Sequence, residues 1–272
     1  MKPVAFEYAR PASVAEALGM LAAQPGAKVL AGGQTLGPML NLRLAQPALL
    51  VDITRIPDLA AVAEEREAVA IGATVTHAAI EDGRTPDPTG GFLARVARGI
   101  AYRAVRTRGT IGGSLAHADP AADWVACLAA LGAQVEIAGP GGTRRVAAAA
   151  FVRGAMETEL GEAELVTGVR LPRFSRRARF GFHKICRKVG EFADAIGVVA
   201  CDPESAYYCA VAGATHGPPL VMELRAGPDG PKAMTAGEAA AILRTQRYAG
   251  DAYELKLHAA ALARASQMAF SA

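Results

Sequence analysis

A pair of adjacent glycines, Gly112 and Gly113, interrupts the segment 108–123, RGTIGGSLAHADPAAD. Downstream, Asp119 has the character of a helix N-cap and Pro120 suits the first helical position. The expected helix has an apolar face made of Trp124, Cys127, Leu128 and Leu131. The segment therefore predicts a glycine turn that leads into a helix. Such a turn presents backbone N–H groups without side chains in the way, which suits an anionic phosphate.

A second glycine pair, Gly32 and Gly33, lies in the segment 29–38, VLAGGQTLGP, where an apolar strand gives way to a helix. Two such turns could bind the two phosphates of one cofactor, although either alone is more often ordinary turn chemistry. Neither turn matches G-x-G-x-x-G or G-x-x-x-x-G-K-[ST], so a nicotinamide Rossmann site or a P-loop is not supported. The two turns together indicate a phosphate-bearing cofactor.

Composition narrows the class of protein. Of the 272 residues, 51% are hydrophobic, which is enough to build the cores of two or three compact lobes. The net charge is only +3 and the arginines are scattered, so a nucleic-acid partner is not supported. No apolar run reaches the roughly 18 residues of a membrane span, and the N-terminus lacks the features of a secretory signal. We therefore expect a cytoplasmic protein without a membrane span.

Local patterns divide the chain into three parts. Residues 1–56 predict a β-α-β lobe. A capping box at Ser13 and Glu16 begins a helix that ends at about Ala23. A strand at 27–30, a helix at 35–44 and a strand at 49–53 then form the β-α-β unit. Residues 57–175 predict a second lobe with a short helix capped by Thr76, an arginine-bearing helix over 91–105, and strands at 69–73, 134–138, 143–147 and 164–172.

Residues 176–272 predict an α+β domain in which strands precede helices. Three or four short strands are expected, over 180–187, 194–201, 206–214 and 219–226. A second capping box, Thr235 with Glu238, opens the first of two helices, and the second spans about 252–269. Its expected apolar face contains Tyr253, Leu255, Leu257, Ala260 and Leu262.

Three segments carry a family resemblance: 31–59, 106–124 and 182–193. The chain resembles, over nearly its whole length, the FAD-binding medium subunit of the molybdenum hydroxylases. That group includes carbon monoxide dehydrogenase and bacterial dehydrogenases of purines and N-heterocycles, and the same module is the flavin domain of xanthine dehydrogenase. The resemblance implies an α+β fold: a two-lobed FAD-binding domain of the PCMH/vanillyl-alcohol-oxidase type, followed by a C-terminal antiparallel sheet with helices.

The resemblance also implies a set of cofactor-binding positions. Ala31, Gly32, Gly33, Gln34 and Thr35 match the first pyrophosphate loop, and Thr110, Ile111, Gly112, Gly113 and Ser114 match the second. Ile100 and Ala101 match positions beside the flavin. Lys184 matches a lysine near the flavin ring, where a cation would stabilise the anionic reduced form. Asp123 matches an acidic residue that binds a ribityl or ribose hydroxyl.

Asp123 has a second interpretation, because a carboxylate in the first turn of a helix is favourable without any ligand. If it binds the cofactor, we expect it to matter less for folding than for affinity. The sequence also departs from the pattern of the family: many relatives have asparagine at Ser114, a tyrosine near Phe182 and aspartate at Glu191. Those differences affect the expected flavin potential rather than FAD binding.

The activity implied is that of an electron relay without catalytic or metal-binding residues in this chain. A large molybdenum-cofactor subunit would hydroxylate a small molecule, and a small subunit would carry [2Fe–2S] clusters. FAD here would deliver the electrons to an external acceptor. The expected assembly is a dimer of such heterotrimers. The four cysteines have no metal-ligand spacing, so any iron belongs to another chain.

Other interpretations remain open. A stand-alone FAD-dependent oxidase or reductase of the same fold would need its own substrate pocket and base, and a non-catalytic nucleotide-binding module or a structural scaffold would need neither. A group of arginines between the glycine motifs is either a solvated face or a contact with a partner subunit or a cofactor phosphate. The group consists of Arg95, Arg98, Arg103, Arg106 and Arg108.

Overall fold

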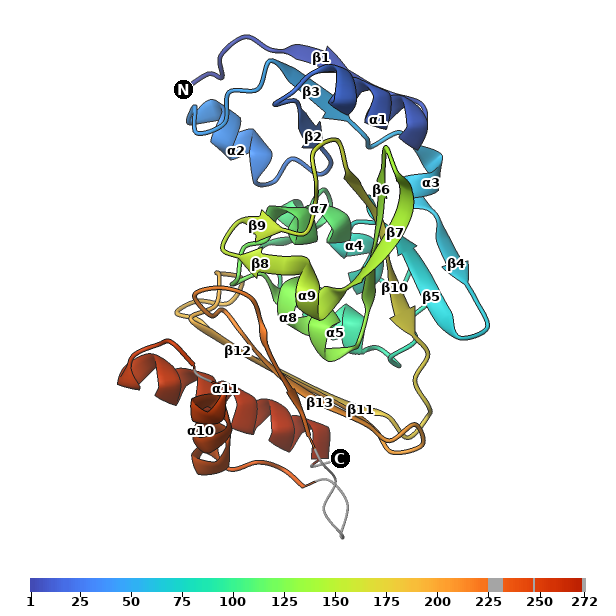
Figure 1. Ribbon diagram of the computed structural model, residues 1–272. Coiled ribbons are helices and arrows are strands. Elements are labelled where there is room, and N and C mark those ends of the chain that lie inside the picture. The colour runs from blue at the N-terminus through green and yellow to red at the C-terminus, as the bar shows by residue number, and fades with distance from the viewer. Residues whose placement is uncertain (225–231, 247, 271–272) are drawn as a thin grey trace.

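A computed structural model describes residues 1–224, 232–246 and 248–270, which form three stacked layers (Figure 1). An N-terminal lobe lies at one end, a central lobe follows, and a four-stranded sheet backed by two helices lies at the other end. Within the described residues, no helix is both long and apolar enough to cross a bilayer.

The N-terminal lobe is a three-stranded parallel sheet with the strand order β1-β3-β2. Its elements are β1 (Glu7–Ala9), α1 (Val14–Ala23), β2 (Lys28–Leu30), α2 (Leu36–Asn41) and β3 (Leu49–Asp52). The predicted β-α-β unit is confirmed, whereas the short edge strand β1 was missed because its three residues carry no alternating pattern. Ser13 accepts a hydrogen bond from the Glu16 N–H, as predicted, but the Glu16 carboxylate accepts from Ala12 instead of Ser13.

The central lobe contains a five-stranded antiparallel sheet with the order β4-β5-β10-β6-β7. Its strands are β4 (Val62–Glu64), β5 (Ala68–Gly72), β6 (Gln134–Gly139), β7 (Gly142–Ala147) and β10 (Leu165–Pro172), with β8 (Val152–Gly154) and β9 (Glu157–Thr158) forming a separate pair. Its helices are α3 (Pro57–Ala60), α4 (His77–Glu81), α5 (Phe92–Arg98), α6 (Arg103–Arg106), α7 (Ile111–His117), α8 (Asp123–Ala130) and α9 (Ala148–Phe151).

Two helix predictions in this lobe are wrong. The single helix expected over 91–105 is broken, because Ala101 adopts the left-handed backbone conformation, with a φ of 42°, between α5 and α6. Asp119 is not an N-cap: its Oδ1 accepts a hydrogen bond from the Ala121 N–H in a turn, and α8 begins four residues later, at Asp123. The same aspartate-to-backbone bond serves turns and helix caps, so the sequence alone does not separate them.

The C-terminal layer is an antiparallel sheet in the order β11-β12-β13-β14, as predicted. Its elements are β11 (Arg179–Ile185), β12 (Ala195–Asp202), β13 (Tyr207–Gly213), β14 (Leu220–Glu223), α10 (Ala236–Thr245) and α11 (Ala252–Phe270). The capping box of Thr235 and Glu238 is confirmed. The predicted end of the last strand, at 226, lies outside the described residues.

Helices cover both faces of this sheet. On one face, α11 packs through an alanine-rich stripe, and a Cβ on Gly197 would lie 2.4 Å from the Ala261 backbone. Tyr253, expected on the apolar face, is 67% exposed instead. The other face of the sheet packs on α8, so all eight residues of α8 are buried, not only its predicted apolar face. The main hydrophobic core is therefore shared between the central lobe and the C-terminal sheet.

Candidate functional site

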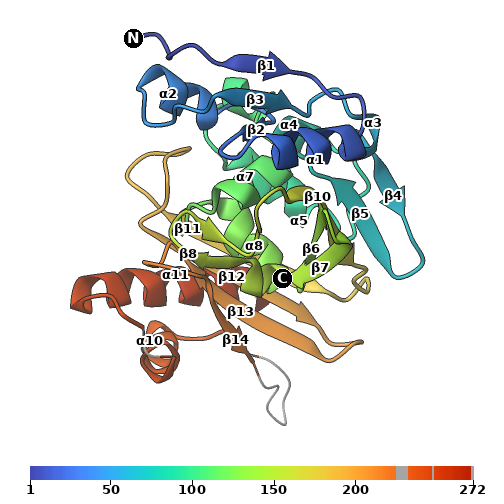
Figure 2. The same cartoon turned by 45° about the horizontal axis from the view of Figure 1, so that its top comes forward.

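The two glycine motifs, far apart in sequence, lie against each other where the N-terminal lobe meets α7 (Figure 2). A Cβ on Gly32 would lie 2.0 Å from the Arg108 carbonyl oxygen, so the two backbones are in direct contact there. A Cβ on Gly113 would lie 3.8 Å from the Ala31 Cβ. The structure thus joins the two predicted phosphate loops into one surface.

The first motif leaves backbone donors available. Gly33 adopts a φ of 70°, and the chain turns there from β2 toward α2. Over the described ranges 1–224, 232–246 and 248–270, the N–H groups of Gly32, Gly33 and Gln34 have no protein acceptor. Thr35 stands at the N-cap of α2 without a side-chain capping bond. This loop has the donors that an anionic group requires.

The second motif differs from the exposed turn that was expected, because it forms the first turn of α7. Thr110 is the N-cap, and its Oγ1 accepts a hydrogen bond from the Gly113 N–H at 3.1 Å. The Ile111 and Gly112 N–H groups donate to the carbonyls of Val75 and Ala73, each at 3.0 Å. Two of its amide donors therefore serve to fix α7 on the end of β5 and are not free for a ligand.

Behind this motif lies a buried histidine that sequence reasoning missed. The Trp124 Nε1–H donates to His77 Nδ1 at 3.0 Å, and the His77 backbone N–H donates to the Gly109 carbonyl at 2.9 Å. The first bond requires a bare Nδ1, so the ring is neutral. Burial, helped by the charge of Arg106, lowers the pKa of His77 to about 4. No local pattern pairs His77 with Trp124; the contact arises only from packing.

This pKa makes stability depend on pH. In the unfolded chain His77 takes up a proton at about 6.5, whereas in the fold it stays neutral down to about pH 4. The contribution of His77 to the free energy of unfolding is complete above pH 6.5. It falls by about 3 kcal/mol as the pH drops to 4. His77→Gln keeps an acceptor for Trp124 but does not titrate. Urea unfolding at pH 7 and pH 4 should therefore show that the free energy of unfolding falls more for the parent than for the variant. Equal falls would contradict the assignment of His77 as buried and neutral.

Asp123 and Lys184, both predicted site residues, form a buried ion pair between α8 and β11. Lys184 Nζ lies 2.9 Å from Asp123 Oδ1, and the two side chains are 9% and 8% exposed. The same ammonium donates to the Gly99 carbonyl at 3.1 Å. Asp123 Oδ1 accepts no aligned hydrogen bond in the described parts of the chain. Burial raises the pKa of Asp123, and the nearby ammonium opposes that shift.

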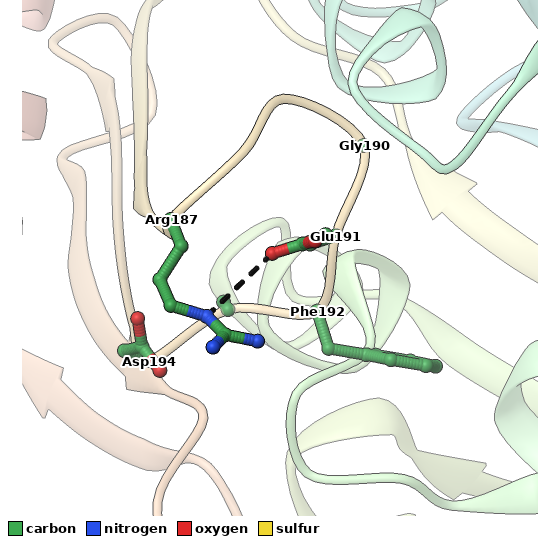
Figure 3. Close-up of a pocket in the computed structure, with 6 residues that line it drawn as sticks. Arg187, Gly190, Glu191, Phe192 and Asp194 are labelled. Atoms are coloured by element: carbon green, nitrogen blue, oxygen red, sulfur yellow. Dashed lines mark ion pairs between the residues drawn. The ribbon is translucent and has the colours of Figure 1, made fainter.

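The loop that follows β11 packs on the segment that holds this pair, and Figure 3 shows the side chains of the loop. A Cβ on Gly190 would lie 2.8 Å from the Ala101 carbonyl oxygen, so this loop touches the predicted flavin-contact residues. Arg187 and Glu191 form an ion pair at 3.8 Å. They line a cavity of about 350 Å³ together with Phe192, whose side chain is 67% exposed. The site is thus bounded by residues from all three layers.

Comparison with known proteins identifies the family. Residues 4–174 match the model of the FAD binding domain in molybdopterin dehydrogenase. The carbon monoxide dehydrogenase medium chain of Hydrogenophaga pseudoflava is 42% identical over 202 residues, 72% of this chain and 68% of that protein. The nicotine 6-hydroxylase medium subunit of Paenarthrobacter nicotinovorans is 36% identical over 192 residues, 71% of this chain and 67% of that protein.

The same relationship holds in three dimensions. A solved structure of the Hydrogenophaga pseudoflava carbon monoxide dehydrogenase, in a form lacking the Mo-pyranopterin moiety of its cofactor, aligns with a TM-score of 0.90 and 33% identity over 100% of this chain and 99% of that chain. The predicted α+β fold of such a medium subunit is confirmed by this match. The chain therefore belongs to the family of FAD-binding domains of molybdopterin dehydrogenases.

Proposed function

We propose that this chain is the FAD-carrying subunit of a heteromeric molybdenum hydroxylase and relays electrons to an external acceptor. The observation that carries the proposal is the family match over 4–174, joined to a full-length structural match with a carbon monoxide dehydrogenase chain. Relatives of the same kind are medium subunits of carbon monoxide dehydrogenase and nicotine 6-hydroxylase. The substrate is bound by another subunit in this proposal, so the chain itself does not identify it.

The residues present fit FAD. The free N–H groups of Gly32, Gly33 and Gln34 would bind the pyrophosphate, and Gly113 excludes a side chain, since an added Cβ would lie 2.8 Å from Thr110 Oγ1. When bound, FAD supplies the electron-transfer chemistry. The remaining proposed contacts are the hydroxyls of Thr35, Thr110 and Ser114 around the phosphates, and Ile100 and Ala101 beside the flavin. Ile111 and Gly112, whose N–H groups bond to Val75 and Ala73, would contribute only the shape of the loop.

The buried pair of Asp123 and Lys184 would hold the ring end of the cofactor. Asp123 Oδ1 is a buried acceptor without an aligned donor, which suits a ribityl or ribose hydroxyl. The Lys184 ammonium, tied to Asp123 and Gly99, places a positive charge at this end of the site. A fixed cation favours a reduced, anionic flavin over the oxidised one.

The proposed partners are a large molybdenum-cofactor subunit and a small [2Fe–2S] subunit, assembled as a dimer of heterotrimers in the cytoplasm. The three domains proposed for this chain are the two FAD-binding lobes at 1–56 and 57–175 and the C-terminal domain at 176–272. In this arrangement the chain binds and orients FAD, and it supplies no catalytic base.

Anaerobic reduction separates a relay from a self-contained flavoenzyme. The isolated chain should be yellow, release FAD on denaturation, and show no bleaching of the flavin band with purines, N-heterocycles, aldehydes or carbon monoxide. When the two partner subunits are co-expressed with it, one of these compounds should bleach the band. Rapid bleaching of the isolated chain would support a stand-alone oxidase or reductase, and a colourless chain that takes up no FAD would refute the proposal.

A further inference from the structure

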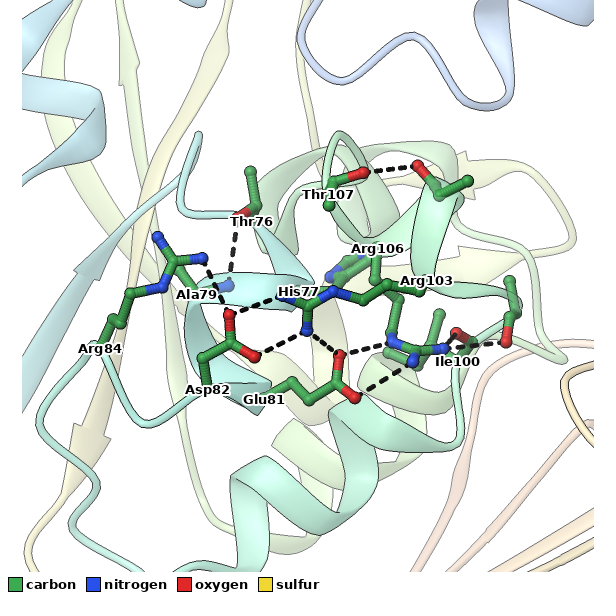
Figure 4. Close-up of polar contacts among 12 residues, drawn as sticks. Thr76, His77, Ala79, Glu81, Asp82, Arg84, Ile100, Arg103, Arg106 and Thr107 are labelled. Atoms are coloured by element: carbon green, nitrogen blue, oxygen red, sulfur yellow. Dashed lines mark hydrogen bonds and ion pairs between the residues drawn. The ribbon is translucent and has the colours of Figure 1, made fainter.

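A buried arginine holds the loop between α5 and α6 (Figure 4). Arg106 is 8% exposed. Its Nε and Nη2 donate to the two carboxylate oxygens of Glu81, at 2.7 and 3.1 Å. Its Nη1 donates to the carbonyls of Ile100 and Ala101, at 2.9 and 3.0 Å. The interpretation of the arginine group as a solvated face is therefore wrong for Arg106, although the other four members are exposed.

The loop at 99–101 has a backbone conformation that needs hydrogen bonds to hold it. Ala101 has a φ of 42°, in a left-handed region that is unfavourable for a residue with a Cβ. Three successive carbonyls in this loop bind cations: Gly99 binds Lys184, and the next two bind Arg106. The two cations come from β11 and α6, so the loop is fixed from two different layers. Gly99 ends α5 as its C-cap, and these contacts hold the left-handed conformation of Ala101 beyond it.

We propose that Arg106 is a positioning residue for the flavin: it fixes the backbone at Ile100 and Ala101, the two residues proposed to lie beside the ring. The inference rests on the proposed function. Arg106 acts through the loop and does not touch the cofactor. The planar guanidinium spreads its donors over three nitrogens and so reaches a carboxylate and two carbonyls at once, whereas the three donors of lysine leave from one nitrogen and do not span these acceptors.

Arg103 provides a matched control from the same cluster. Its Nη1 donates to Glu81 Oε2 and Asp82 Oδ1, and its Nη2 donates to Asp82 Oδ2, each at 2.7 Å. Its side chain is 48% exposed. Over residues 1–224, 232–246 and 248–270, Arg103 makes no hydrogen bond to a carbonyl of the 99–101 loop, and the two arginines share only Glu81. Replacing each by lysine therefore perturbs the same ion-pair cluster, but only one replacement releases the loop.

The experiment compares the parent with Arg106→Lys and Arg103→Lys. FAD affinity is measured by titration of the deflavinated chain, flavin orientation by visible circular dichroism, and loop order by amide hydrogen exchange over 99–103. We expect Arg106→Lys to weaken FAD binding about tenfold or more, to change the flavin dichroism, and to speed exchange in the loop. Arg103→Lys should stay within about twofold of the parent in affinity, because exposed ion pairs contribute little. Parental affinity and dichroism in Arg106→Lys would overturn the proposal.

Folding and cofactor identity are tested separately. If Arg106→Lys does not fold, Glu81→Gln weakens the anchor of Arg106 while leaving the arginine in place. It should give a smaller loss of affinity and the same change in dichroism; an unchanged spectrum there would refute the positioning role. If the parent takes up no FAD, the proposed function fails. Hydrogen exchange then still decides whether Arg106 orders the loop, because that readout needs no cofactor.

Discussion

Replacing Gly32 by alanine is expected to abolish tight FAD binding. A Cβ at this position would lie 2.0 Å from the Arg108 carbonyl oxygen and 2.6 Å from its carbon, far inside van der Waals contact. The clash involves backbone on both sides, so no rotamer change relieves it, and the two loops must separate. Overpacking of about 3 kcal/mol would correspond to roughly a hundredfold loss of affinity. Titration with FAD and thermal unfolding measure the two consequences.

Gly19→Ala is the matched control for this substitution. Gly19 lies inside α1, in the same lobe, and an added Cβ there meets no atom within 4 Å. Alanine should stabilise the helix by up to about 1 kcal/mol and leave FAD affinity unchanged. If Gly32→Ala binds FAD as tightly as Gly19→Ala does, the contact between the two glycine motifs is not needed for the site.

The second large effect concerns Asp123→Ala, which should destabilise the fold by about 3–5 kcal/mol. Removing the carboxylate leaves the Lys184 ammonium buried without a counter-charge, and that is the costly way to break such a pair. The expectation that Asp123 matters less for folding than for affinity does not fit this geometry. Denaturant unfolding in the absence of FAD measures the loss, and a variant as stable as the parent would contradict the prediction.

A double variant separates stability from binding. Lys184→Met in the Asp123→Ala background removes the orphaned charge and should restore most of the lost stability, because contacting residues are strongly coupled. FAD affinity should remain about ten- to a hundredfold below the parent if this pair contacts the cofactor, because both proposed contacts are then absent. Recovery of affinity together with stability would show that the pair acts only through folding.

Much of the fold follows from local sequence signals. The parallel pairing of β2 with β3, the caps at Thr76 and Thr235, and the antiparallel strands β11 to β14 were predicted because each depends on a cap, a turn or an apolar run within a few residues. The break at Ala101 was not predictable in this way. Gly99 is compatible with a helix end, but no local signal places a left-handed backbone at Ala101, and bonds from Lys184 and Arg106 hold the open loop.

In the site, too, local sequence signals predicted some features and tertiary packing determined the others. The two glycine motifs stand out in the sequence, and the family resemblance indicated which of their residues to consider. Their physical roles differed from the local expectation: the amides of Ile111 and Gly112 bond to the carbonyls of Val75 and Ala73 in the turn beyond β5, and Gly32 is required by the approach of Arg108. The pairing of Asp123 with Lys184 depends on how the C-terminal sheet packs on α8, which no local pattern encodes.

The contact between Gly32 and Arg108 also has a consequence for the order of assembly. It brings together two loops that lie far apart in the first half of the chain, and such long-range contacts form slowly, after local structure is in place. We therefore expect the phosphate-binding surface only in a chain whose N-terminal and central lobes have already docked. Cofactor capture would then follow that docking, and bound FAD would stabilise the docked form, since it binds only that form.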